Sequence, residues 1–436
     1  MAIPRKRPKG HLVRPQFLRL CLALLSVGLV CIGAPVRLTA PTEWIKTFRP
    51  EVGSYRYGWD VKQTLDGGYI TAGSVHYWTV VYPGYYKKIR SHIYLFRADG
   101  MGQLLWQRVY MNPGDEDAFS VLPTADGGFI LTGYTTSFGA GGGDVCLMKT
   151  DGLGNPLWLK TYGGPGSDVG RSLQPTPDGG YIMAGETSSF GAGSYDFYLV
   201  RTDGSGNPIW QKTFGGVDSD QASSVRTTPD GGFIVAGTTR FLATGSSDIF
   251  LLRVDTAGNT LWQKTLGGER REEASDIQPT YDGGYAIAGV RNDPNGYAGS
   301  GENNISLIKT DGSGNVLWQA TFGGPKNDAA SCLLQTFDGG FIIGGVWAEA
   351  SFEDGGPCLL RTDRSGNLLW QKVFRTDTFP TLISAVEQTY EGGFIATGSD
   401  TGHDDSGAGH WGVPLYKLGI EESFHKKKTL PREIRR

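Results

Sequence analysis

Cysteine is scarce in this chain, with five residues in 436. Two of them, Cys21 and Cys31, lie in an N-terminal apolar run. The other three, Cys146, Cys332 and Cys358, are too dispersed for a zinc site or for the disulfide framework of a small secreted domain. We therefore expect each of these three to be an isolated buried thiol.

A strong charge of one sign is also missing, because the formal net charge is only −3. This gives no general reason to expect nucleic acid as a partner. The chain has no G-x-S-x-G nucleophile elbow, no nucleotide-binding glycine loop and no H-E-x-x-H metal motif. We accordingly expect no cofactor, no bound metal and no nucleic-acid partner.

Helical periodicity is absent after residue 40, and a repeated unit takes its place. The tryptophan of this unit recurs at Trp44, Trp106, Trp158, Trp210, Trp262, Trp318 and Trp370. An acidic residue followed by two glycines recurs at Asp66, Asp126, Asp178, Asp230, Asp282, Asp338 and Glu391. Seven copies of one unit therefore account for nearly all of the chain after residue 40.

One unit reads as four short strands. In the best-preserved copy we expect them at residues 208–214, 222–228, 233–239 and 248–254. The pair Asp230-Gly231 between two strand patterns is a strong hairpin signal, because glycine accepts the positive φ that such a turn requires. Gly258 is a natural left-handed residue of the next hairpin loop.

The third and fourth strands are apolar at nearly every position, which is typical of a sheet covered on both faces. Four-stranded sheets arrayed radially meet this condition, as in the blades of a β-propeller. The last unit lacks its own tryptophan strand, and residues 43–48 supply one at the start of the repeat region. We therefore predict an all-β fold, a seven-bladed β-propeller of four-stranded antiparallel blades over residues 41–420. The N-terminal strand should complete the last blade, with the tryptophan strands outermost, and we expect a monomer.

The segments FGGVDSDQASSV, DGGFIVAGTT and DIFLLRVDTAGN resemble the SBBP-type β-propeller repeat of bacterial and archaeal proteins. The resemblance covers about residues 41–420 and implies an exported or cell-surface protein. The segment D-x-x-G-N-x-x-W also resembles the tryptophan-docking repeat of quinoprotein propellers. Those enzymes would imply eight blades and a quinone and calcium site, whereas this chain has seven tryptophan units and no vicinal cysteine pair.

The two ends of the chain lie outside the repeat. Residues 1–40 combine a basic leader with the apolar run 20–34, which predicts a signal peptide or an uncleaved membrane anchor. Residues 421–436 form a basic tail, for which a solvated segment is the simplest interpretation. We expect an extracytoplasmic protein that is secreted, periplasmic or on the cell surface, with membrane attachment through the N-terminal segment left open.

Two sets of residues recur in register with the repeat. The tryptophans are expected to pack between blades, since large aromatic side chains dominate burial. An acidic series follows five of the seven tryptophan strands, at Glu116, Asp168, Asp220, Glu272 and Asp328, and is broken by Arg56 and Thr381. We expect these carboxylates on loops of one propeller face, either as solvated polar residues or as a surface that attracts cations or basic partners.

Departures from the repeat are better indicators of function, because blade packing gives no reason for them. With strands counted outward from the inner strand of a blade, the loop between the second and third strands of blade 1 expands to residues 74–92, and the equivalent loop of blade 7 covers residues 400–411. Ring closure makes these blades neighbours. The residues that we predict to bind a ligand or partner there are Trp59, Trp78, Tyr82, Tyr85, Tyr86, His403, Asp404, Asp405, His410 and Trp411. The alternative is that the long segment buries its own rings or covers the closure seam.

These features favour an exported, non-enzymatic binding or interaction scaffold whose partner is a protein or a glycan. Clustered exposed aromatic residues suit both classes of partner. The alternative is an extracytoplasmic carbohydrate-active hydrolase or lyase with its site on the same face. In that case Asp404 or Asp405 and one carboxylate of the acidic series would form an acid–base pair.

Overall fold

The computed structural model describes residues 44–49, 55–82, 85–240, 246–292, 303–324, 326–348, 355–374, 382–399 and 412–419, and the side chains of these except 78–89. All regular secondary structure in these residues is β, with strands grouped into four-stranded antiparallel sheets. The predicted N-terminal leader and C-terminal tail lie outside the described residues. Within the described residues, no helix is long and apolar enough to cross a membrane.

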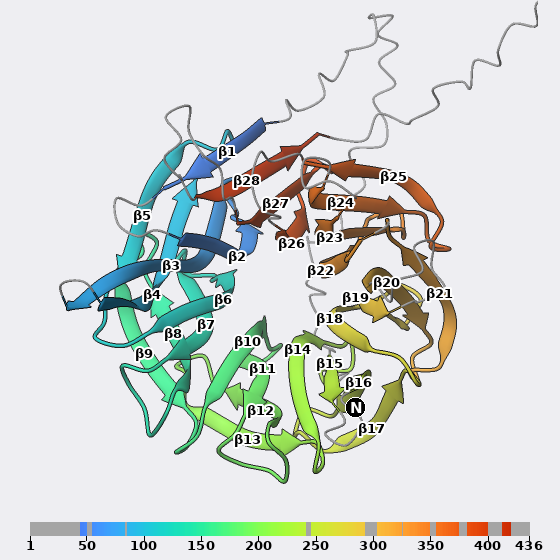
Figure 1. Ribbon diagram of the computed structural model, residues 1–436, viewed down its shortest axis with the longest axis horizontal. Coiled ribbons are helices and arrows are strands. Elements are labelled where there is room, and N and C mark those ends of the chain that lie inside the picture. The colour runs from blue at the N-terminus through green and yellow to red at the C-terminus, as the bar shows by residue number, and fades with distance from the viewer. Residues whose placement is uncertain are drawn as a thin grey trace, which may run out of the picture. The chain divides into compact units, whose positions relative to one another are not determined.

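The sheets are the blades of a ring, and each is numbered in chain order (Figure 1). Blade 1 consists of β2 (Tyr55–Gln63), β3 (Tyr69–Tyr82), β4 (Tyr85–Ala98) and β5 (Leu104–Tyr110). Blade 2 consists of β6 (Glu116–Pro123), β7 (Phe129–Thr135), β8 (Asp144–Thr150) and β9 (Pro156–Tyr162). Blade 3 consists of β10 (Asp168–Pro175), β11 (Tyr181–Thr187), β12 (Asp196–Thr202) and β13 (Pro208–Phe214).

The other blades repeat this order along the chain. Blade 4 consists of β14 (Ser219–Thr227), β15 (Phe233–Arg240), β16 (Ser247–Val254) and β17 (Thr260–Leu266). Blade 5 consists of β18 (Glu272–Pro279), β19 (Tyr285–Asn292), β20 (Asn303–Thr310) and β21 (Val316–Phe322). Blade 6 consists of β22 (Ala329–Gln335), β23 (Phe341–Trp347), β24 (Gly356–Thr362) and β25 (Leu368–Val373). Blade 7 consists of β26 (Ile383–Gln388), β27 (Phe394–Gly398), β28 (Val413–Leu418) and β1 (Trp44–Phe48).

The ring closes as the repeat predicts. Strand β1 pairs antiparallel with β28, so that Trp44 lies opposite Lys417 and the N-terminal strand completes blade 7. Across the seam, the backbone N–H of Tyr390 donates to Gln63 Oε1 at 2.8 Å. Blades 6 and 7 share the equivalent bond between the N–H of Phe337 and Gln388 Oε1, at 3.0 Å. The predicted seven-bladed β-propeller is therefore confirmed.

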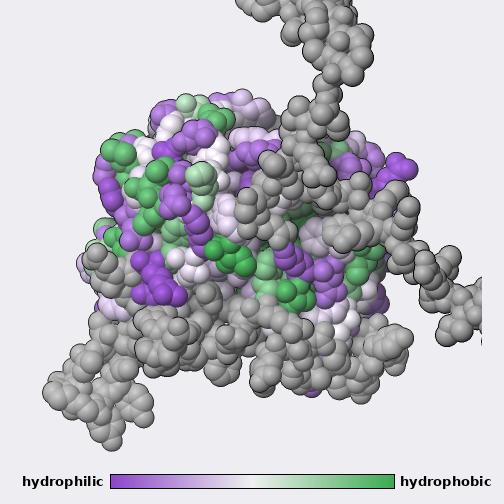
Figure 2. Space-filling view, turned by 90° about the horizontal axis from the view of Figure 1, so that it is seen from above, coloured by the Kyte–Doolittle hydropathy of each residue, from purple (hydrophilic) through white to green (hydrophobic). Residues whose placement is uncertain are grey.

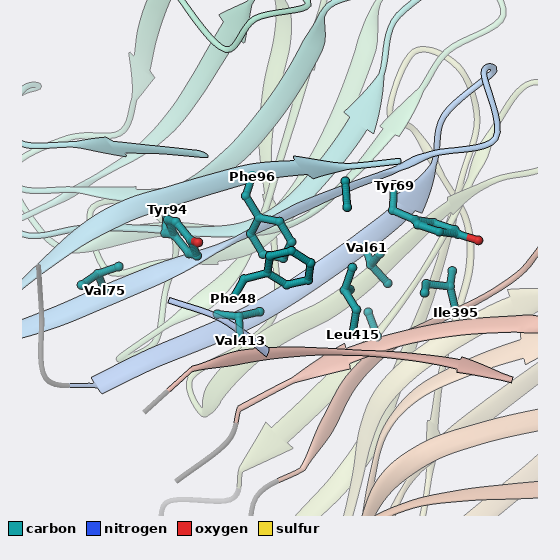
Figure 3. Close-up of a cluster of buried hydrophobic side chains, with 11 residues drawn as sticks. Phe48, Val61, Tyr69, Val75, Tyr94, Phe96, Ile395, Val413 and Leu415 are labelled. Atoms are coloured by element: carbon teal, nitrogen blue, oxygen red, sulfur yellow. The ribbon is translucent and has the colours of Figure 1, made fainter. Parts of the chain in front are cut away.

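The seam is packed like an ordinary interblade interface. Phe48 of β1 stacks on Phe96 of blade 1, with ring centroids 4.4 Å apart. Figure 3 shows this cluster of buried side chains, in which Val413 and Leu415 of β28 face the blade 1 residues. Because burial of apolar surface is the main favourable term in folding, strand β1 contributes to stability as well as to hydrogen bonding.

Each repeated tryptophan packs on the next blade, as predicted. Trp210 of blade 3 lies against Phe233 of blade 4, with ring centroids 6.2 Å apart, and its Nε1 donates to the carbonyl of Thr256. Gly258 has a φ of 74°, and a Cβ there would lie 3.1 Å from the Trp210 ring. Glycine is thus favoured at this turn both by its left-handed backbone and by the indole that covers it.

The acidic turns carry one ion pair in each blade. A basic residue next to the end of each blade's third strand, counted from the inner strand, approaches the turn carboxylate. In blade 5 this pair is Lys309–Asp282, with an N–O distance of 3.0 Å. The other pairs are Arg97–Asp66, Lys149–Asp126, Arg201–Asp178, Arg253–Asp230, Arg361–Asp338 and Lys417–Glu391. Burial opposes the charge of Asp282, but hydrogen bonds from Thr280 and Lys309 outweigh it and lower its pKa to about 2. The acidic residues therefore serve the turns, in agreement with their sequence pattern.

One prediction about blade 1 is wrong. The expanded segment 74–92 is not a loop, because β3 and β4 continue as a paired hairpin from His76 opposite Ser91 to Tyr82 opposite Tyr85. The alternating aromatic and β-branched residues of this segment favour strand, and their pairing lets them extend past β2. The extended ends of β3 and β4 run toward the outer edge of the ring (Figure 1).

All three cysteines in the described residues are buried free thiols, as expected. Burial raises the pKa of Cys146 to about 12, so that it stays protonated at neutral pH. On the rim, the outer strands carry exposed apolar side chains, such as Ile45 and Leu105, beside polar ones. Seen edge-on, the surface accordingly mixes hydrophobic and hydrophilic residues (Figure 2).

Candidate functional site

A β-bulge interrupts the first, innermost strand of every blade at the same position. In blade 1 the register shifts between Gly58 and Asp60, which leaves Trp59 without a partner on β3. Such bulges re-aim a side chain. The bulged residues are Trp59, Phe119, Arg171, Ser223, Ser275, Ser331 and Ser384. All of them line a central cavity of about 650 Å³.

This ring of bulged residues is chemically lopsided. Blades 4 to 7 each contribute a serine, whereas blades 1, 2 and 3 contribute Trp59, Phe119 and Arg171. The Trp59 and Phe119 rings meet edge to face at 5.7 Å, and the Arg171 guanidinium lies 5.1 Å from the Phe119 centroid. We call Trp59, Phe119 and Arg171 the channel wall. It places flat apolar surface and a cation opposite a row of hydroxyl groups.

Arg171 is held in place by a buried carboxylate. Its Nε and Nη2 donate to Glu186, whose side chain is 4% exposed, with a shortest N–O distance of 2.6 Å. Burial opposes the charge on Arg171, but the bonds and charge of Glu186 outweigh it and raise the pKa of Arg171. No residue that the structure describes bonds its Nη1, so these donors remain for a ligand.

Some charged side chains in the cavity stabilise the fold by bonding the backbone of the neighbouring blade. The backbone N–H of Val121 donates to Asp60 Oδ2 at 3.0 Å, and that of Leu333 donates to Asp276 Oδ2 at 2.9 Å. Each carboxylate thereby links one blade to the next. The charged residues that line the cavity are Lys62, Arg171, Arg226 and Arg240 against Asp60, Glu273, Asp276 and Glu387. The two signs balance, so the cavity does not favour a strongly charged ligand.

The acidic series is not on an exposed face, and both expectations for it were wrong. Glu116, Asp168, Asp220, Glu272 and Asp328 are all buried, at 8% exposure or less. They lie at or beside the first residue of an inner strand, where Asp168, Asp220 and Asp328 accept hydrogen bonds from the loop that precedes it. The N–H of Gly164, for example, donates to Asp168 Oδ2 at 2.9 Å. These carboxylates fold the connections between blades and are inaccessible to a partner.

Each carboxylate of this series lies near a second residue, which belongs to the third strand of the preceding blade. In blades 2, 3 and 4 that residue is Asp144, Asp196 or Asp248. Burial raises the pKa of Asp196 and the nearby charge of Asp220 raises it further. In blade 1 the matching position holds His92, which pairs with Val75 as Asp144 pairs with Thr135.

His92 forms a hydrogen-bonded series that sequence reasoning missed. Its Nδ1 lies 3.1 Å from Glu116 Oε2, and its Nε2 is hydrogen-bonded to the hydroxyl of Tyr77. His92 and Glu116 are each 1% exposed, whereas Tyr77 is only partly buried. Aligning residues 91–98 with 143–150 would have placed His92 on the repeated aspartate and shown the substitution.

A second contact series joins the channel wall to the β3–β4 hairpin. Tyr57 stacks on Trp59 at 5.4 Å, and its ring centroid lies 5.0 Å from that of His76. His76 Nε2 and the Ser91 hydroxyl each lie 3.3 Å from Asp117, a residue of blade 2. Burial, with the charge of Asp117, raises the pKa of Tyr57. The inner wall and the hairpin therefore form one continuous surface at this end of the channel.

The structure places the predicted site residues unevenly. Trp59 lines the cavity, while Trp78 and Tyr82 lie in β3, and Tyr85 and Tyr86 in β4, with side chains outside the described set. The predicted residues of blade 7 lie outside the described residues, namely His403, Asp404, Asp405, His410 and Trp411. Phe119 and Arg171 were missed, although each stands where four other blades carry serine.

No metal centre is evident in the part of the chain that the structure describes. It contains no group of three or more His, Cys, Asp or Glu side chains arranged to hold an ion. The buried carboxylates occur instead in pairs that bond backbone and hydroxyl groups, as Asp168 does with Gly164 and Ser189.

Comparisons with known proteins agree with the fold and go little further. No family model matches the chain. The regulatory protein FlaEY of Caulobacter vibrioides is 25% identical over an alignment of 285 residues, and the match covers 57% of this chain and 28% of FlaEY. The chain thus spans less than a third of that relative's length. The resemblance to SBBP-type repeats stays a prediction.

Solved structures resemble the ring at low sequence identity. An ulvan lyase from a new family of polysaccharide lyase, bound to -[GlcA(1-4)Rha3S]-, superposes with a TM-score of 0.54 at 10% identity. The match covers 82% of this chain and 91% of the lyase. A second ulvan lyase structure gives a TM-score of 0.53 at 11% identity, covering 84% of this chain and 95% of that one. At such identities the likeness shows the fold alone.

Proposed function

We propose that this protein is an extracytoplasmic glycan-binding propeller whose ligand lies in the central cavity against the channel wall. The observation that carries the proposal is the lopsided ring of bulged residues. A symmetric repeat gives no structural reason for tryptophan, phenylalanine and arginine at the positions where four blades have serine. Binding sites are commonly concave and combine apolar walls with a few placed polar groups.

The chemistry of the wall suits a sugar. The Trp59 and Phe119 rings offer flat surfaces to the C–H face of a pyranose, and aromatic residues combine large contact area with little entropy loss. The Arg171 Nη1 donors and the hydroxyls of Ser223, Ser275 and Ser331 would bond sugar oxygens. Because the cavity charges balance, a neutral or weakly acidic glycan is favoured over a polyanion.

Two further observations support this class of ligand. The cavity of about 650 Å³ is within the range of roughly 300–1,000 Å³ usual for small-ligand sites. The ulvan lyase that shares the fold is bound to the saccharide -[GlcA(1-4)Rha3S]-. Export through the N-terminal leader would bring the protein to the compartments where such polysaccharides occur.

A protein partner is the second candidate, and the extended hairpin favours it. The strand pairing from Trp78 opposite Ile89 to Tyr82 opposite Tyr85 presents an aromatic-rich ribbon beyond the blade. Aromatic residues are enriched among binding hot spots. In this version Trp78, Tyr85 and Tyr86 would anchor the partner, and the channel wall would be dispensable.

A glycan array followed by calorimetric titration tests the proposal. The Trp59→Ala substitution should weaken glycan binding about 30-fold or more, as removal of an anchor worth roughly 2 kcal/mol does. Tyr281→Ala is the matched control, because Tyr281 is 69% exposed and lies beside an acidic turn away from the cavity. Equal binding by the wild type and Trp59→Ala, or no glycan bound at all, would reject the channel site.

A further inference from the structure

The strongest feature that glycan binding leaves unexplained is the series Tyr77–His92–Glu116. The Tyr77 hydroxyl meets His92 Nε2, and His92 Nδ1 lies 3.1 Å from Glu116 Oε2. The Ser137 hydroxyl donates to the other oxygen of Glu116. An ionised carboxylate only accepts hydrogen bonds, so Glu116 places the imidazole proton on Nδ1 and leaves Nε2 as an acceptor toward Tyr77.

The fold does not need this arrangement. At the same position blades 2 and 3 use two carboxylates, Asp144 with Asp168 and Asp196 with Asp220, and blade 5 uses Asn304 with Asp328. None of these three positions carries an imidazole. Among the described blades that have a polar residue at this position, only blade 1 has a buried histidine beside a partly exposed tyrosine hydroxyl.

We propose that Tyr77 is an acid–base residue, activated by His92 and Glu116. Its hydroxyl passes its proton to His92 Nε2 and accepts one from an acidic C–H of the ligand, while the Glu116 carboxylate stabilises the imidazolium that forms. The electron pair of the broken C–H bond forms a C=C bond as the C–O bond to the departing oxygen breaks. The imidazolium proton then returns through Tyr77 to that oxygen. A base oriented by a third group is the general logic of activated hydroxyls in enzymes.

Tyr77 does not line the cavity itself, but it lies on the hairpin that the second contact series joins to the channel wall. Tyr77 follows His76 in β3, and His76 is linked through Tyr57 to the channel wall at Trp59. The proposal rests on the glycan-binding function only for the identity of the molecule that is transformed. Activation of the phenol can be measured without any glycan, so the two ideas can fail separately.

Labelling with an aryl sulfonyl fluoride measures the activation. The Tyr77 oxygen displaces fluoride, so that an S–O bond forms and the S–F bond breaks, and the phenol proton moves to His92 before leaving with fluoride. Peptide mass spectrometry reports the rate at each tyrosine. Tyr281 and Tyr390 are internal references, since they are 69% and 64% exposed. Accessibility alone would make Tyr77 slower than both.

We expect Tyr77 to react at least about tenfold faster than Tyr281, at the low end of what a positioned base contributes. His92→Gln keeps a hydrogen-bonding side chain but takes no proton, so the rate at Tyr77 should fall below that of Tyr281. Glu116→Gln should reduce it less. Asp196→Asn, at the matching position of blade 3, should leave Tyr77 labelling unchanged.

Two results would overturn the inference. One is a rate at Tyr77 no higher than at Tyr281 in the folded wild-type protein. The other is fast labelling that persists in His92→Gln with the melting temperature unchanged, because this would separate reactivity from the histidine. If His92→Gln fails to fold, the labelling rate at Tyr77 in Glu116→Gln tests the inference in the same way. Glutamine is nearly isosteric with glutamate, and its amide oxygen still accepts from the Ser137 hydroxyl.

Discussion

Blades 1 and 4 share a scaffold and differ in what they present. Both have a bulged inner strand, an acidic turn paired with a third-strand arginine, and a tryptophan that covers the next blade. They differ at the bulge, where Trp59 stands in place of Ser223, and at the third strand, where His92 stands in place of Asp248. Their second strands also differ, because β3 has 14 residues and β15 has 8.

The difference separates positions that build the ring from positions that are free to vary. Two residues beyond the bulge, the backbone bonds the neighbouring blade, as in the bond from the Val225 N–H to the Ser172 hydroxyl at 3.2 Å. The bulged side chain itself takes no part in that bond, so it can be serine, tryptophan or arginine without altering the sheet. A repeat protein thereby acquires a site in one sector at little structural cost.

The largest expected effect concerns the strand that makes blade 7 equivalent to the others. Deleting residues 41–50 removes β1 with Phe48, which is 6% exposed, and leaves β28 as an open edge. We expect a loss of more than about 5 kcal/mol, since a buried phenylalanine alone is worth roughly 3–5 kcal/mol, together with aggregation through the edge. Thermal melting and light scattering measure both. Ile45→Ser, on the same strand but 58% exposed, should behave like the parent.

The next effect tests the repeated tryptophans. Trp210→Ala removes the contact with Phe233 and the bond to Thr256 at the blade 3–4 interface. Because Trp210 is only half-buried, we expect a loss of roughly 2–4 kcal/mol, at or below the range for fully buried rings. Denaturant unfolding provides the measurement, and glycan affinity of the folded fraction should not change. An unaltered unfolding midpoint would show that the tryptophans are not interblade anchors.

Sequence alone predicted the ring but only part of the site. The blades, their closure and the role of Trp210 follow from spacing, because each repeated residue answers the same packing need in every copy. The cavity position of Trp59 could not be predicted, since a bulge depends on pairing with β3 and leaves no mark on the alternation of β2. Asp168 was placed on an exposed loop for a similar reason, because the bonds that bury it come from residues up to 21 positions away.

A substitution with a smaller expected effect gives blade 2 the serine that blades 4 to 7 carry at the bulge. Phe119→Ser removes one face of the channel wall but keeps the bulge, since serine occupies this position elsewhere in the ring. We expect glycan affinity to fall about tenfold, or roughly 1.4 kcal/mol, with little change in melting temperature. Titration of the glycan found on the array gives the measurement. Tyr281→Ala is the control, because Tyr281 is exposed and does not line the cavity. An equal loss of affinity in both variants, or no loss in Phe119→Ser, would contradict the proposed wall.

The smallest effect concerns the buried carboxylate pairs that blade 1 replaces with His92 and Glu116. Burial and the charge of Asp220 raise the pKa of Asp196 in the folded state above its unfolded value. Its contribution to stability is therefore fully present below the unfolded pKa, near 3.9, and is lost as pH rises through the folded pKa.

Asp196→Asn should raise the melting temperature slightly at pH 7, on the order of 1 °C, and leave it unchanged at pH 3. Blade 5 already carries Asn304 beside Asp328, which shows that the ring accepts an amide at this place. Melting curves across this pH range decide the point, and a variant less stable at pH 7 than at pH 3, relative to the parent, would reverse the sign of the argument.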